Sequence, residues 1–325
     1  MKDIVNNILS VSQDTFGAHA LDIFQFQYQQ NIVYKNWVDA LRIDIKKVTE
    51  FAHIPFLPVS FFKTHKVVTG PIEPELVFES SGTTRTANSR HFVKEPKLYT
   101  ESFTEGFRKF YGDPKDWCII GLLPSFLERK GSSLIMMVEE LIRISGHNKS
   151  GFYLYEFEKL ASVLQDLEDR KQKTLLIGVT FALLDFADQF PIKLKYTTVM
   201  ETGGMKGRRK EMVREEVHAI LQQRLGVPTV HSEYGMTELL SQGYSFGEGI
   251  FNTVPWMKVL VRDEDDPLLI TGKGRGLINV IDLANIYSCS FIATDDVGRI
   301  FEDGSFEVVG RRDNSDIRGC SLMVM

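Results

Sequence analysis

The stretch KTLLIGVTF, residues 173–181, decides the fold class, because it is an apolar run with the length of a strand. Such a run is typical of a strand that is buried on both faces. Two similar runs lie on either side of it, DWCIIGLLPS at 116–125 and TTVMETGG at 197–204. The segments at 133–145 and 209–226 have the apolar spacing of helices, and Gly226 ends the second one. Alternating buried strands and helices favour an α/β core.

The two ends of the chain have different patterns from this core. Residues 1 to about 50 have helical spacing, with apolar residues three or four positions apart. After residue 245 the apolar runs become short and strand-like, as in WMKVLVRD at 256–263 and GLINVIDL at 276–283. We therefore expect residues 1–245 to form an α/β core with an N-terminal helical segment. Residues 246–325 should form a β-rich portion of the same domain with a short C-terminal tail.

The composition excludes several classes of protein. The chain has 325 residues, of which 43% are hydrophobic and 25% charged, as in ordinary globular proteins. Its net charge of -5, with no basic arm, gives no indication of a nucleic-acid partner. Cys118, Cys289 and Cys320 have neither metal-site nor disulfide spacing, which suits a reducing compartment. The N-terminus is unlike a signal peptide, and no apolar run is long enough for an integral membrane segment. We expect a cytoplasmic protein.

The first candidate site is a loop rich in small hydroxyl residues, within VFESSGTTRTANSRHFV at 77–93. It follows a short apolar run, and ligands of α/β sheets bind at the carboxyl ends of strands. Free backbone N–H groups, hydroxyls and a glycine are what a phosphate-binding loop requires. The loop lacks the Gly-Lys-Ser/Thr ending of a Walker A motif. An ordinary surface turn is the alternative.

The second candidate is HSEYGMTE at 231–238, where a strand runs into a loop. Tyr234 can stack on a planar ring, and Thr237 can donate to a phosphate. Glu238 can hold a hard cation such as Mg²⁺. The alternative is a solvated turn with a partly buried tyrosine.

Two more polar groups follow predicted strands near the C-terminus. Asp295 and Asp296 are adjacent carboxylates, which on a loop can bind the vicinal hydroxyls of a ribose, or can form a type I turn. Arg311 and Arg312 follow Gly310 and a strand. They can meet ribose or phosphate oxygens, or take part in an ion pair in a polar turn.

Taken in order, these four motifs resemble the series found in the adenylate-forming enzymes of the acyl-CoA synthetase-like superfamily. Within it, LLPSFLERKGSSLIMM at 122–137 and RGCSLM at 318–323 are similar to the acyl-protein synthetases of bacterial bioluminescence. The resemblance runs from about residue 50 to the end. It implies an adenylate-forming fold and the ATP- and Mg²⁺-dependent activation of a carboxylic acid, expected to be fatty. The acyl-adenylate formed would then pass its acyl group to a cysteine thiol as a thioester.

The resemblance also implies roles for individual residues. The loop would hold the β- and γ-phosphates, with an arginine in place of the family's usual glycine; its residues are Ser80, Ser81, Gly82, Thr83, Thr84 and Arg85. The backbone beside adenine would be Gly203 and Gly204. Adenine would stack on Tyr234, which Gly235 follows, Thr237 would touch the α-phosphate, and Glu238 would ligate Mg²⁺. Asp296 would bind the ribose, with Arg311 beside it.

The chain departs from the wider superfamily at its C-terminus. There, a C-terminal lid domain follows the Gly-Arg-x-Asp motif and carries a catalytic lysine. Here the sequence ends 12 residues after Asp313, and no lysine follows Lys273. We therefore expect no full lid domain. Either other cations supply the charge, from among Arg85, Arg90, His91, Lys130 and Lys206, or the activity is weak, or a partner completes the site.

Cys320 lies five residues from the C-terminal end. The resemblance implies that it accepts the acyl group, and the neighbouring Arg318 would lower the pKa of its thiol. A small residue closing the last strand is the alternative. Cys118 and Cys289 lie in apolar runs and are expected to be inert core residues.

Three functions fit these observations. The first is an acyl-protein synthetase that passes its acyl group to a partner such as a reductase. The second is an acyl- or aryl-CoA ligase with CoA as the acceptor. The third is a nucleotide- or acyl-binding protein that has kept the fold without turnover.

Overall fold

The computed structural model describes residue 5 and residues 7–80, 88–123, 131–204, 209–210 and 212–312. Short 3-10 helices connect some of its regular elements. The α-helices are α2 (Gln13–Gln30), α3 (Ile32–Ala40), α4 (Phe61–Thr64), α5 (Pro96–Tyr111), α6 (Ser133–Ser145), α7 (Phe157–Asp169), α8 (Thr180–Gln189) and α9 (Arg214–Leu225). The first half of the strands comprises β1 (Leu57–Pro58), β2 (Leu76–Glu79), β3 (Arg90–Val93), β4 (Cys118–Leu122), β5 (Gly151–Phe152), β6 (Thr174–Val179), β7 (Thr197–Thr202) and β8 (His231–Tyr234). The second comprises β9 (Gly243–Ser245), β10 (Ile250–Thr253), β11 (Met257–Arg262), β12 (Ile270–Thr271), β13 (Gly274–Asp282), β14 (Phe291–Ile300) and β15 (Phe306–Arg311).

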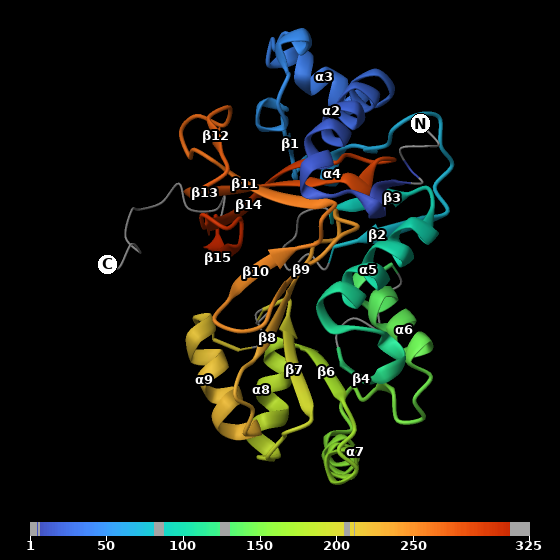
Figure 1. Cartoon of the computed structure of the whole chain (residues 1–325), viewed down its shortest axis with the longest axis vertical. Helices are drawn as coiled ribbons and strands as arrows, with labels where there is room; N and C mark the ends of the chain where they lie inside the picture. The colour runs from blue at the N-terminus through green and yellow to red at the C-terminus, as the bar shows by residue number, and fades with distance from the viewer. Residues whose placement is uncertain are drawn as a thin grey trace.

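One large mixed sheet runs through the described part of the chain in the order β12-β11-β13-β14-β15-β10-β9-β8-β7-β6-β4-β5. The pairs from β5–β4 through β6 and β7 to β8 are parallel, and the pairs from β8–β9 through to β11–β12 are antiparallel. Figure 1 shows the parallel part with α7, α8 and α9 in the lower half, and β11 to β14 in the upper half. The predicted mixed α/β class is confirmed, and it includes the β-rich C-terminal portion.

The parallel strands form because their apolar runs are covered on both faces. Every residue of β4 and β6 is buried. α6 packs on β4, and α8 packs on β6 and β7. Gly178 in β6 allows the close approach of α8, since a Cβ atom at this position would lie 2.8 Å from Leu183 Cγ. The strands and helices predicted around residue 173 are therefore present.

The N-terminal helical segment packs on the C-terminal half of the chain. Gln27, buried in α2, donates from Nε2 to the carbonyl of Ile286 at 2.9 Å and accepts from the backbone of Ser290. Asn31, between α2 and α3, donates to the carbonyl of Ser288 at 2.8 Å. These buried amides fix the helices against the connection between β13 and β14 (Figure 1).

Some local predictions were wrong. Asp295 and Asp296 lie inside β14 and not in a loop or type I turn, because β14 continues its pairing with β15 as far as Asp296↔Arg311. Arg311 consequently ends β15 and does not follow it. The helix expected from residue 209 begins at Arg214.

The expected division at residue 245 falls between two paired strands. β9 and β10 form an antiparallel hairpin, with Phe251 opposite Ser245. The sheet continues across this hairpin through β15. Residues 1–245 and 246–325 therefore share one sheet, as parts of one domain would.

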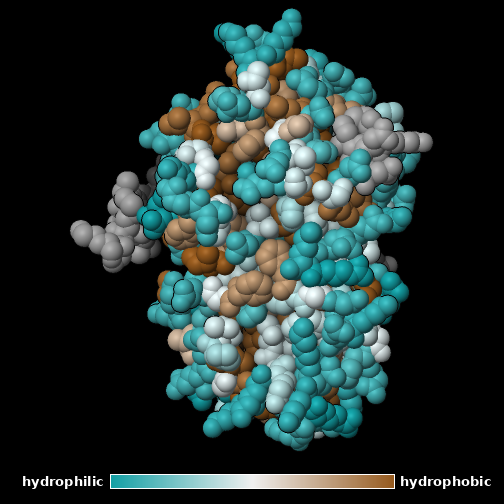
Figure 2. Space-filling view, in the orientation of Figure 1, coloured by the Kyte–Doolittle hydropathy of each residue, from teal (hydrophilic) through white to brown (hydrophobic). Residues whose placement is uncertain are grey.

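The surface is mixed in character. Figure 2 shows hydrophilic residues over much of one face, with hydrophobic residues more frequent in its upper half. No helix in the described ranges is long and apolar enough to span a membrane.

Candidate functional site

Two neighbouring parallel strands bring the glycine pair and the tyrosine motif to one edge of the sheet. β7 and β8 pair in parallel, with Glu201 opposite Ser232, so Gly203, which follows β7, and Tyr234, which ends β8, lie at the same edge. Gly203 and Gly204 are exposed and have φ angles of 74° and 67°. This left-handed backbone favours glycine, and a Cβ atom at 204 would meet nothing within 4 Å. The glycine pair thus leaves the backbone open to a planar ligand at the end of β7.

The residue that precedes Tyr234 is a buried acid. Glu233 accepts a hydrogen bond of 2.6 Å from the hydroxyl of Thr202 at the end of β7. Burial raises the pKa of Glu233 to about 7; the hydrogen bond from Thr202 opposes this rise, and the charge of Glu201 adds to it. A Cβ atom at 235 would lie 2.4 Å from Glu233 Oε1, so any larger residue there would displace the carboxylate. The glycine of the Tyr-Gly motif therefore leaves room for Glu233 in its present position.

Tyr234, Asp296 and Arg311 are brought together, although they lie far apart in sequence. The Tyr234 hydroxyl donates to Asp296 Oδ2 at 2.9 Å. Asp296 and Arg311 are cross-strand partners, and Arg311 Nε lies 3.9 Å from Asp296 Oδ1. Burial raises the pKa of Asp296, while Arg311 and the Tyr234 hydroxyl lower it. Three predicted nucleotide contacts therefore form one polar cluster.

Thr237 and Glu238 occupy a turn two residues beyond this cluster. Glu238 is buried, with 5% of its surface exposed. Burial raises its pKa; a hydrogen bond from the Ser89 side chain and the charges of Arg311 and Lys63 oppose this rise. Lys63, in α4, is a cation near this turn that the sequence reasoning missed.

The hydroxyl-rich loop connects β2 and β3, which pair with Glu79 opposite Arg90. Ser80 closes its base, because Ser80 Oγ accepts from the backbone of Ser89 at 2.9 Å. The other predicted loop residues lie outside the described part of the chain: Ser81, Gly82, Thr83, Thr84 and Arg85. The contact between Ser89 and Glu238 nevertheless places the base of the loop beside the turn that carries Glu238.

His91 does not supply the positive charge that its place in the loop segment suggested. It is buried, and burial lowers its pKa to about 4, against the hydrogen bonds to Thr237 and Asn285 that raise it. The ring is therefore neutral at pH 7. Arg90 remains the described arginine of this segment and lies over the Phe92 ring at 5.6 Å.

Two of the three cysteines were predicted to lie in the core and the third near the C-terminal end. Cys118 and Cys289 are buried, as expected, and burial raises the pKa of the two thiols to about 11 and about 12. Both are therefore inert as thiolates at neutral pH. Cys320, Lys130 and Lys206 lie outside the described residues.

The donors present fit a magnesium nucleotide. Mg²⁺ in such sites takes one or two carboxylates and completes its shell with water and phosphate oxygens. Glu238 supplies a carboxylate beside the base of the hydroxyl loop. Among the described residues, no group of three or more His, Cys, Asp or Glu side chains forms a metal cage.

One comparison with known proteins shows a family, and another shows the type of fold. The model of one protein family, described as "Acyl-protein synthetase, LuxE", matches residues 9–325. No curated protein matches the chain.

Several solved structures resemble this chain in fold. An open conformation of 2-hydroxyisobutyryl-CoA ligase, in complex with 2-HIB-AMP and CoA, has a TM-score of 0.62 at 11% identity, covering 95% of this chain and 78% of its own. ATP-bound MatB from Rhodopseudomonas palustris has a TM-score of 0.54 at 18% identity, covering 72% of this chain and 47% of its own. A luciferase-like enzyme from the Zophobas morio mealworm has a TM-score of 0.52 at 17% identity, covering 78% of this chain and 61% of its own. This chain thus matches about half the length of MatB. Identities this low show the fold alone.

Proposed function

The chain belongs to the LuxE family of acyl-protein synthetases, which are ligases, and from this we propose that it activates a fatty acid with ATP and transfers the acyl group to a cysteine thiol. The observation that carries the proposal is the convergence of Tyr234, Asp296 and Arg311 with the turn of Thr237 and Glu238. They meet at the edge of the sheet where α/β proteins bind nucleotides.

In the proposed first reaction, a carboxylate oxygen of the acid attacks the α-phosphorus of ATP. The new bond joins that oxygen to phosphorus, and the bond from phosphorus to the bridging oxygen of pyrophosphate breaks. Tyr234 and the Gly203–Gly204 backbone would orient adenine, and Asp296 would hold the ribose. Thr237 would donate to the α-phosphate, and Glu238 would hold Mg²⁺, which offsets the charge of the departing pyrophosphate.

Two cations lie near the turn of Thr237 and Glu238. Arg311 and Lys63 both act on the charge of Glu238. We propose that Arg311 serves the nucleotide, because its guanidinium reaches toward Asp296.

In the proposed second reaction, the thiolate of Cys320 attacks the acyl carbon of the adenylate. A thioester forms and AMP leaves with its oxygen. A partner of the reductase type would then take the acyl group from the protein.

Acid-dependent exchange of labelled pyrophosphate into ATP tests the first reaction. We expect exchange with a fatty acid and none without an acid, and a Glu238→Gln variant should lose it. A protein that shows no exchange with any acid would contradict the proposal.

Retention of labelled acid tests the second reaction. Label should stay on the protein through gel filtration and be released by hydroxylamine, as for a thioester. Cys320→Ser should exchange pyrophosphate normally but retain no label, whereas Cys289→Ser should retain it. If the label appears on added CoA and never on the protein, the chain is a CoA ligase.

A further inference from the structure

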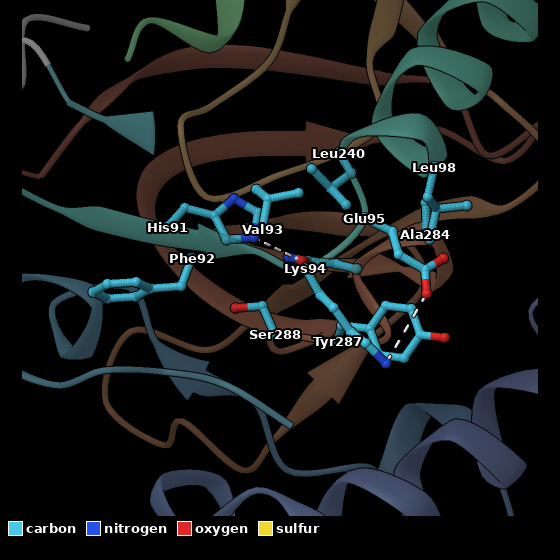
Figure 3. A pocket seen from close by; sticks show the side chains of 11 residues that line it. His91, Phe92, Val93, Lys94, Glu95, Leu98, Leu240, Ala284, Tyr287 and Ser288 are labelled. Carbon is cyan, nitrogen blue, oxygen red and sulfur yellow. Dashed lines mark hydrogen bonds and ion pairs between the residues drawn. The ribbon is translucent and has the colours of Figure 1, made fainter. Parts of the chain in front are cut away.

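The strand that follows the hydroxyl loop carries a buried histidine that the proposed reaction does not use. His91 in β3 has 1% of its surface exposed. Its ring packs against Phe62 and Phe78, with centroid distances of 5.9 and 6.3 Å. Figure 3 shows the ring beside a pocket whose other walls include Val93 and Leu240.

Both nitrogens of this ring reach backbone or side-chain oxygens from other elements. His91 Nδ1 lies 2.9 Å from the carbonyl oxygen of Thr237. Its Nε2 lies 2.9 Å from Oδ1 of Asn285, in the 3-10 helix η5 (Leu283–Asn285). The histidine therefore joins the hairpin β2–β3 to two segments that are 146 and 194 residues away.

Asn285 extends this connection to the next residue of the turn. Its amide nitrogen donates to the carbonyl of Glu238 at 2.7 Å and to that of Cys289 at 2.9 Å. Both of these partners are acceptors, so the orientation of the amide is fixed and Oδ1 must face His91. The successive carbonyls of Thr237 and Glu238 are thus held from outside the turn by His91 and Asn285.

We propose that His91 is a positioning residue, which through Thr237 and Asn285 fixes the turn of Thr237 and Glu238 against the hairpin that carries the hydroxyl loop. This inference rests on the proposed function, in which these two residues contact the α-phosphate and Mg²⁺. Partners of metal ligands generally matter for this reason, because they set the orientation of the ligand. His91 itself touches neither the nucleotide nor the cation.

The contacts of His91 with Thr237 and with Asn285 cannot both be hydrogen bonds donated by a neutral ring, so they can be tested separately. A neutral imidazole carries one N–H, while both neighbouring oxygens are acceptors, so the ring can donate to only one of them at a time. Neither the carbonyl of Thr237 nor Oδ1 of Asn285 has a proton, and of the two only the carbonyl belongs to the turn. We assign the donated proton to Nδ1, which makes the Thr237 contact the one that holds the turn.

Two substitutions distinguish the nitrogens. Asparagine places an amide nitrogen near the position of Nδ1, and glutamine places one near Nε2. His91→Asn can therefore keep the bond to Thr237, and His91→Gln can keep only the bond to Asn285. Val93→Ala is the matched control, since Val93 is buried two residues along the same strand and makes no side-chain hydrogen bond.

The experiment measures pyrophosphate exchange at varied Mg²⁺ and acid concentrations. We expect His91→Gln to lower kcat about 10- to 100-fold and to raise the Mg²⁺ concentration at half-maximal exchange, with the KM for the acid unchanged. His91→Asn should stay within about threefold of the wild-type protein. Val93→Ala should lower stability and leave the Mg²⁺ dependence unchanged. Equal activity of His91→Gln and His91→Asn, or an equal Mg²⁺ shift in Val93→Ala, overturns the inference.

A second measurement does not depend on turnover. Amide hydrogen exchange over residues 237–240 should speed up in His91→Gln more than in His91→Asn or Val93→Ala. No difference among the variants overturns the positioning role. The wild-type protein could exchange no pyrophosphate while the variants still differ in amide exchange as expected. That result would overturn the proposed function and leave the positioning role of His91 intact.

Discussion

At the scale of single residues, the closest constraint in the site is between Glu233 and Gly235. Any Cβ atom at 235 would lie 2.4 Å from Glu233 Oε1. We expect Gly235→Ala to lower the free energy of unfolding by about 1–3 kcal/mol, because the acid must move and strain its bond to Thr202. Urea denaturation measures this. In a Glu233→Ala background the same change should cost less than about 0.5 kcal/mol; an undiminished cost would show that the acid is not the cause.

Glu233 also makes the stability of the folded protein depend on pH, with a sign that follows from its raised pKa. The folded protein keeps the Glu233 proton up to about pH 7, whereas the unfolded chain releases it near the ordinary value of 4.5. The unfolded state therefore binds fewer protons in this range, and the stability contributed by this group falls as the pH rises from about 4.5 to about 7. Glu233→Gln should remove this loss.

The measurement is the free energy of unfolding of both proteins across this range. The stability of Glu233→Gln relative to wild type should rise by about 3 kcal/mol between pH 4.5 and pH 8. A difference that stays constant with pH would mean that Glu233 is ionised when folded.

At the scale of elements, Asp282 fastens the segment after β8 to the end of β13. This buried carboxylate accepts from the backbone of Leu240 at 2.7 Å, from the backbone and hydroxyl of Ser241 at 3.0 and 2.6 Å, and from the backbone of Ala284. Asp282→Ala should lower the free energy of unfolding by at least about 2 kcal/mol, since buried donors lose their acceptor. Chemical denaturation measures the loss.

A comparable aspartate on the surface serves as the control. Asp303 accepts from the backbone and hydroxyl of Ser305, two residues away. Asp303→Ala should cost less than about 1 kcal/mol, because water replaces the lost acceptor. Equal losses in the two variants would contradict the fastening role of Asp282.

How much of these elements could be predicted depended on whether the signal was local. β4 and β6 were predictable because their runs are mainly apolar and every residue in them is buried, and β7 because Val199 and Met200 lead into the glycine pair. The short strands β9 and β10, at 243–245 and 250–253, were missed, since few residues carry their pattern and pairing across the sheet stabilises them. Asp295 and Asp296 were predicted in a loop for a similar reason, because the pairing with β15 outweighs their polar character.

The residues of the candidate site also fall into those that the sequence could predict and those that it could not. The Tyr-Gly-x-Thr-Glu run and the aspartates could be found because each is contiguous and their order is distinctive. His91, Asn285 and Asp282 could not, since their partners lie 41 to 194 residues away. The sequence showed only that a histidine follows the hydroxyl loop. It was interpreted as a possible cation, whereas burial makes the ring neutral.

At the scale of the whole molecule, the continuous sheet predicts a single cooperative unfolding transition. Trp117 precedes β4 in the parallel part, and Trp256 precedes β11 in the antiparallel part. Both are buried, and Trp256 also donates to Ser102 in α5. The chain has three tryptophans, so one variant can keep only Trp117 and another only Trp256. The urea midpoints measured by fluorescence should be the same in the two variants, once the effect of the substitutions on stability is subtracted. Separate midpoints would indicate two independent units on either side of residue 245.

The central claim concerns which phosphorus the acid attacks. Fatty acid with both carboxyl oxygens labelled with ¹⁸O, incubated with the protein, Mg²⁺ and ATP, tests it by mass spectrometry of the nucleotide products. Attack at the α-phosphorus predicts AMP that carries one ¹⁸O atom, released when the acyl group passes to a thiol. ADP with ¹⁸O in inorganic phosphate, or AMP without label, would contradict the account.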